Sequence, residues 1–117
     1  MKRDTDSICR KLLETRGPRE VSEWINEGDN TLGELGREES LSLADEIYKA
    51  GAAHVYAIEI EEHPEGSSTG KLIIELPDDA AARQRVLAWA AKIASQQGFG
   101  DDPDTDTGQR YVFSMLD

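Results

Sequence analysis

The stretch HVYAIEIEEHPEGSSTGKLIIEL, residues 54–76, decides the fold. Apolar and other side chains alternate at both of its ends, as in strands that bury one face, and its middle is rich in turn-forming residues. The pattern predicts two antiparallel strands whose connection is longer than a two-residue turn. We expect the buried face of these strands to consist of Tyr56, Ile58, Ile60, Leu72, Ile74 and Leu76.

Amphipathic helices are expected on either side of this pair of strands. Residues 38–50 place apolar side chains on one side and charged side chains on the other, and Gly51 is suited to end that helix. A second helix is predicted between Pro77 and Gly98, and a final strand over residues 110–116. The apolar side of this second helix comprises Ala82, Val86, Trp89, Ala90, Ile93 and Ala94. Of these, we expect Val86, Trp89 and Ile93 to pack on Ile58, Ile60 and Ile74.

These elements predict an α+β fold of the ferredoxin-like kind, a split βαβ sandwich (βαββαβ) with two helices on one face of an antiparallel sheet. In that topology the first strand lies between the third and the fourth. The sequence leaves open whether Thr31–Leu35 or Val21–Ile25 supplies this strand. Residues 1–28 are predicted to form an N-terminal helical extension that packs on a domain of residues 29–117. So widely used a topology indicates no single function.

Charge and cysteine content restrict the functional classes. The 117 residues include 24 acidic and 13 basic side chains, for a net charge of −11, which repels phosphate backbones and anionic lipids. We therefore expect neither direct nucleic-acid binding nor membrane binding. Cys9 is the only cysteine and no leader-like segment is recognisable, so the sequence favours a reducing, cytoplasmic location.

The alternation of the two strands also predicts an acidic sheet face opposite the helices. The strand over residues 71–76 has no aromatic side chain, so this face lacks the platform on which RNA-recognition domains of the same topology stack bases. The simplest interpretation is that glutamates keep a one-sided sheet soluble. The functional interpretation is a docking face for a basic partner, composed of Glu59, Glu61, Ile73 and Glu75.

Patterns for catalysis or metal binding are weak. Asp102, Asp104 and Asp106 have the spacing of a calcium loop, but its closing position is not acidic, so any calcium site there would be adventitious. His54 and His63 have no partner at metal-ligand spacing. We therefore predict no catalytic, cofactor-binding or metal-ligating residue and no cofactor.

Three functional classes remain. The sequence favours a small non-catalytic binding or regulatory module, which acts through an interaction surface toward a protein partner or by self-association. The alternative is an acidic inhibitor or immunity-type protein that neutralises a basic toxin or nucleic-acid enzyme. The third is a small enzyme with an active site built by dimerisation, for which His54, His63 and Tyr111 are the candidates.

Overall fold

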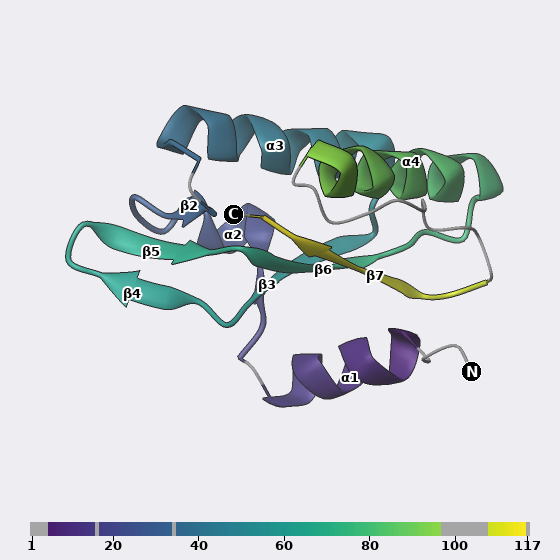
Figure 1. Cartoon of the computed structure of the whole chain (residues 1–117), viewed down its shortest axis with the longest axis horizontal. Helices are drawn as coiled ribbons and strands as arrows, with labels where there is room; N and C mark the ends of the chain where they lie inside the picture. The colour runs from purple at the N-terminus through teal and green to yellow at the C-terminus, as the bar shows by residue number, and fades with distance from the viewer. Residues whose placement is uncertain (1–4, 16, 34, 97–107, 117) are drawn as a thin grey trace.

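The computed structural model describes residues 5–15, 17–33, 35–96 and 108–116 of the chain. Helices lie on both faces of a central antiparallel sheet (Figure 1). One face carries α3 (Arg37–Ala50) and α4 (Ala80–Gln96), and the other carries α1 (Thr5–Thr15). The α+β class and the antiparallel sheet are confirmed. None of the described helices is long and apolar enough to cross a membrane.

The central sheet has four strands in the described part of the chain, in the order β1-β3-β6-β7. They are β1 (Arg19–Glu20), β3 (His54–Ile58), β6 (Lys71–Glu75) and β7 (Tyr111–Met115). Every neighbouring pair is antiparallel. The predicted pairing of the two strands in residues 54–76 is thus confirmed, in a register that places β3 directly beside β6.

The connection between β3 and β6 folds into a hairpin of its own. Its strands are β4 (Glu61–His63) and β5 (Gly66–Thr69), joined by the two residues Pro64 and Glu65. The short strand β2 (Thr31–Leu32) pairs parallel with β5 to complete a second small sheet. Gly66 is required at this hairpin, because its φ is 141° and a Cβ there would lie 2.3 Å from the Asp29 carbonyl oxygen.

The ferredoxin-like strand order is not found. That topology places a first strand between the strands predicted over residues 71–76 and 110–116. This prediction is wrong, because those two strands, β6 and β7, pair directly. Among the described residues of Thr31–Leu35, only those of β2 form a strand, since Gly33 takes a left-handed φ of 55° and the strand ends after two residues. Most of Val21–Ile25 forms the short helix α2 (Val21–Trp24), and β1, just before it, adds to the far edge of β3.

The predicted facing of β3 is also wrong. Val55 lies opposite Ile74 and Ala57 opposite Leu72, so these small side chains face α3 and α4, whereas Tyr56 and Ile58 face α1. Both sets are apolar enough to be buried, and alternation alone does not distinguish them. Glu59 then adopts a φ of 50°. This turn shifts the alternation of side chains between the two sheet faces by one residue. Ile60 therefore packs on the core beneath α3 and α4, although Ile58 does not.

The main core lies between the sheet and the α3–α4 layer. Val86, Trp89 and Ile93 belong to it together with Ile74 and, at its margin, Ile60, as the helical periodicity predicts. Ile58 does not, because its side chain faces α1. The segment before residue 29 contributes directly as well, since Val21, Trp24 and Ile25 are buried in the same core.

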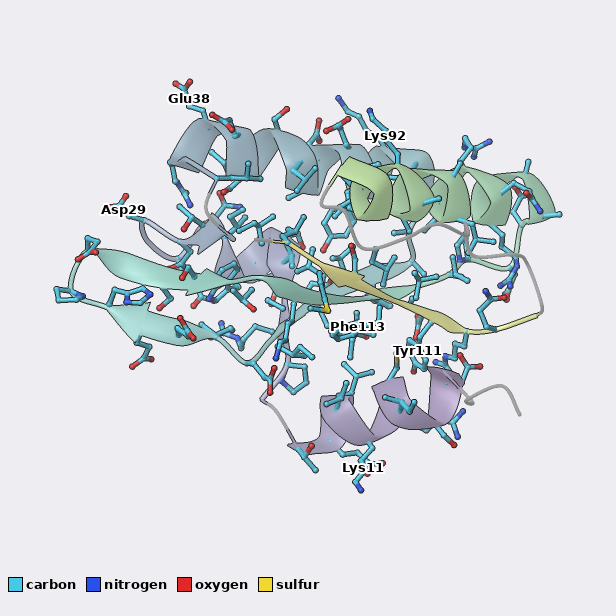
Figure 2. The ribbon with its side chains drawn as sticks, viewed as in Figure 1. Lys11, Asp29, Glu38, Lys92, Tyr111 and Phe113 are labelled. Carbon is cyan, nitrogen blue, oxygen red and sulfur yellow. The ribbon has the colours of Figure 1, made fainter. Side chains whose placement is uncertain are left out.

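A second core lies beneath α1, on the face predicted to be open. Figure 2 shows Tyr111 and Phe113 pointing from β7 toward α1. Cys9 and Ile73 are fully buried in this core, where Ile58 and Tyr111 join them. The expectation of an exposed acidic sheet face is therefore wrong. The helix α1 is amphipathic, and its apolar side covers the apolar residues of this sheet face.

Because Cys9 is buried in the second core, we predict that its thiol is unreactive. Burial, assisted by the nearby charge of Asp6, raises the pKa of Cys9 to about 11. We expect a disulfide reagent at pH 8 to modify the folded protein far more slowly than the protein in denaturant. Because the fold disfavours the thiolate, this thiol also makes stability fall as pH rises from the ordinary thiol range toward 11. Rapid stoichiometric modification of the folded protein would contradict the burial of Cys9.

Candidate functional site

Polar side chains from three strands, one helix and the residue before β7 meet at one end of the central sheet. We call Glu20, Tyr48, His54, Glu75 and Arg110 the Glu20 cluster. Glu20 comes from β1, His54 from β3 and Glu75 from β6, where His54 and Glu75 are register partners. Tyr48 reaches the cluster from α3, and Arg110 immediately precedes β7. The cluster therefore spans the whole width of the sheet.

Glu20 is the centre of this cluster. Its carboxylate accepts hydrogen bonds from the Tyr48 hydroxyl (2.6 Å), the Val55 N–H (2.8 Å) and His54 Nδ1 (2.7 Å). The carboxylate thus takes the place of a further strand residue at the edge of β3. Burial and the hydrogen bond to Glu20 raise the pKa of Tyr48 to about 12.

His54 lies between two carboxylates. Its Nδ1 bonds to Glu20, and its Nε2 is 3.8 Å from Glu75 Oε2. The ring stacks on Tyr56 with a centroid distance of 5.7 Å. Arg110 holds Glu75 through Nη2 (3.0 Å) and Nε (3.1 Å). A general base needs a nitrogen directed at a substrate, and both nitrogens of His54 face protein carboxylates, so this arrangement suits a clamp between strands better than catalysis.

The other two catalytic candidates are not members of the Glu20 cluster, although Tyr111 is the register partner of Glu75. His63 is on the exposed strand β4, where its Nε2 is 3.2 Å from the Ser68 hydroxyl. Tyr111 is buried beneath α1, with the Arg110 guanidinium 5.5 Å from its ring centre. Among the described residues, no group of three or more His, Cys, Asp or Glu side chains could hold a metal ion. The acidic loop with Asp102, Asp104 and Asp106 lies outside the described residues.

The second candidate is the segment that projects from the opposite end of the sheet (Figure 1). We call residues 59–70, which include β4 and β5, the acidic arm. They contain four glutamates and no lysine or arginine: Glu59, Glu61, Glu62 and Glu65. All three residues of β4 are exposed, and the Glu61 side chain is 77% exposed. The arm is therefore a solvated, negatively charged projection.

Each face of the acidic arm borders a hollow. One, of about 560 Å³, is lined by Glu59, Glu61 and Ser68 together with Lys71, which pairs with Glu59. The other, of about 420 Å³, is lined by Glu62 and Ser67 and by residues near α2, among them the ion-paired Arg19 and Glu27. At least one carboxylate of the arm thus lines each hollow.

The four residues predicted as one docking face do not lie together. Glu59 and Glu61 belong to the acidic arm and line the larger hollow. Ile73 is fully buried beneath α1, and Glu75 belongs to the Glu20 cluster with its side chain only 14% exposed. The sequence indicates the charge of the arm, but it does not indicate the Glu20 cluster, whose members come together only through long-range pairing.

Comparison with known proteins adds no assignment. No family model, curated protein sequence or solved structure matches this chain. The Glu20 cluster and the acidic arm are thus the two candidate sites, and the acidic arm is the more exposed of them.

Proposed function

We propose that the protein is a non-catalytic binding module whose acidic arm binds a basic segment of a protein partner. The observation that carries this proposal is the exposure of all of β4 within a segment that has four carboxylates and no cation. The net charge of −11 steers cationic partners toward the molecule and repels nucleic acid. The partner is thus a protein with exposed lysine or arginine.

The hollows beside the arm support recognition of single basic side chains. A lysine or arginine has an apolar stem and a charged head, and it binds best where a carboxylate meets a recess. Glu61 provides a carboxylate at the larger hollow, beside the Glu59–Lys71 ion pair, and Glu62 provides one at the smaller. Because the hollows lie on opposite faces of the arm, a basic segment that runs along one face would meet one of them.

The arm is also held in place, which lowers the entropy lost on binding. The Ser67 N–H donates to Asn30 Oδ1 (3.0 Å), and the Gly33 N–H donates to the Thr69 carbonyl (2.8 Å). The Thr69 hydroxyl donates to the Ile58 carbonyl (2.5 Å). These bonds tie β5 to β2 and β3, so the carboxylates of the hairpin are presented on a fixed framework.

A peptide titration tests this function. We would measure fluorescence anisotropy of a labelled peptide of alternating arginine and alanine with the full-length protein, at low and at high salt. The variant Glu61→Gln/Glu62→Gln/Glu65→Gln should weaken binding about tenfold at low salt, since each exposed charge contributes roughly 0.2–1 kcal/mol. High salt should weaken binding to the unmodified protein as well.

The matched control is Glu38→Gln/Glu39→Gln/Glu46→Gln, which removes the same charge from exposed positions of α3. Figure 2 shows Glu38 on the outer side of that helix, away from the sheet. We expect this control to weaken binding less than about threefold. Equal weakening by both triple variants would show that net charge alone attracts the peptide, and it would overturn the proposed role of the arm.

A further inference from the structure

The outer edge of β7 carries unused backbone hydrogen-bonding groups. The Leu116 N–H bonds to the Gly70 carbonyl (2.6 Å), and the Leu76 N–H bonds to the Arg110 carbonyl (2.7 Å). In an antiparallel ladder every second residue of a strand hydrogen-bonds to a given neighbour, so these two bonds show which residues of β7 bond to β6. The backbone groups of Tyr111, Phe113 and Met115 therefore point away from β6, toward the outer edge of the sheet.

Only the start of this edge is capped. Asp6, in the first turn of α1, accepts the N–H groups of Arg110 (2.9 Å) and Tyr111 (3.0 Å). In the part of the chain that the structure describes, the N–H and C=O groups of Phe113 and Met115 have no corresponding partner. Beyond the end of β1, the Glu20 side chain caps the Val55 N–H of β3 in the same way. Within the described residues, the edge of β7 is thus open from Phe113 to Met115.

The side chains of β7 do not protect this open edge. Soluble proteins usually guard an edge strand with lysine, proline or a bulge. Residues 111–116, YVFSML, have no charge, no proline and no glycine. Met115 is 41% exposed, although it is a large apolar residue. An uncharged strand with free backbone groups is suited to pair with another strand of the same kind.

We propose that β7 pairs antiparallel with β7 of a second copy of this chain, about a two-fold axis at Ser114. Phe113 then faces Met115 of the second copy, and each of the two symmetric pairs exchanges both of its backbone hydrogen bonds. Tyr111 keeps its bond to Asp6. An axis at Phe113 would instead set Tyr111 against the second copy's strand and compete with Asp6. The small side chain of Ser114 at the axis allows the close approach of a non-hydrogen-bonded pair.

Oligomeric state gives the first test. Sedimentation equilibrium of the full-length protein should show a reversible dimer. Met115→Lys should weaken it at least about tenfold, because a charge then lies at the new strand pair. This variant lowers the net negative charge, so weaker dimerisation would not result from greater repulsion. Leu41→Lys, at an exposed apolar position of α3, makes the same charge change and should leave the dimer within about twofold.

A cysteine crosslink tests the register. Ser114→Cys places two thiols opposite each other at the axis, within reach of a disulfide, and mild oxidation should give a covalent dimer. Met115→Cys is more exposed but lies away from the axis, so it should crosslink more slowly. A protein that stays monomeric, a dimer weakened equally by Leu41→Lys, or faster crosslinking through Met115→Cys would each overturn the proposal.

Discussion

Replacing Ile73 by aspartate is expected to unfold the domain. Ile73 is fully buried between the sheet and α1, in the core that includes Cys9 and Ile58. A carboxylate at this position would lose its hydration without a partner, at a free-energy cost of more than about 4 kcal/mol. That is a large fraction of the roughly 5–15 kcal/mol by which a domain is stable. Circular dichroism and urea unfolding measure the effect.

Two further variants serve as controls for the effect of Ile73→Asp. Ile8→Asp places the same charge on an exposed position of α1 and should change the free energy of unfolding by less than about 0.5 kcal/mol. Ile73→Val keeps the site apolar and should cost about 0.5–1.5 kcal/mol. If Ile73→Asp were as mild as Ile8→Asp, the face beneath α1 would be open, as the strand pattern alone predicts.

Replacing Glu20 by alanine is expected to have the second largest effect. The change removes the acceptor of three hydrogen bonds, from Tyr48, His54 and the Val55 N–H, and it leaves two partly buried donors, the Tyr48 hydroxyl and the Val55 N–H, unpaired. We expect a loss of about 3 kcal/mol in the free energy of unfolding, since each unpaired buried group costs roughly 1–3 kcal/mol. Glu20→Gln, which keeps one acceptor oxygen, should lose less.

Tyrosine titration supplies a separate readout of the same contact. The pKa of Tyr48 is about 12 in part because its hydroxyl donates to Glu20, so Glu20→Ala should move this late tyrosine ionisation to lower pH. In the unmodified protein, stability should fall as pH rises from about 10 toward 12, because the fold disfavours the phenolate. An unchanged titration and an unchanged stability would together contradict the central place of Glu20.

Local periodicity predicts the elements of this fold better than their arrangement. The helix with Val86, Trp89 and Ile93 and the strand pair in residues 54–76 follow from patterns within a few residues. The facing of β3 does not follow, because Val55 and Ala57 on one side and Tyr56 and Ile58 on the other are both apolar. The register with β6 and the cover that α1 provides decide it.

The two candidate sites differ in the same way. The acidic arm is visible in the sequence, because four glutamates without a cation fall within residues 59–70. The Glu20 cluster is not visible, because Glu20 is separated from Tyr48 by 28 positions and from Val55 by 35. Nothing in the local pattern around Glu20 distinguishes it from the other acidic residues of the chain.

Chemical-shift mapping tests the proposed function most directly. Isotope-labelled full-length protein would be titrated with the arginine–alanine peptide while the backbone amide resonances are followed. We predict that the largest shift changes fall within residues 59–70, and that the amides of α3 and of His54 change little. Changes spread evenly over the acidic surface, or centred on the Glu20 cluster, would contradict the proposal that the acidic arm is the binding site.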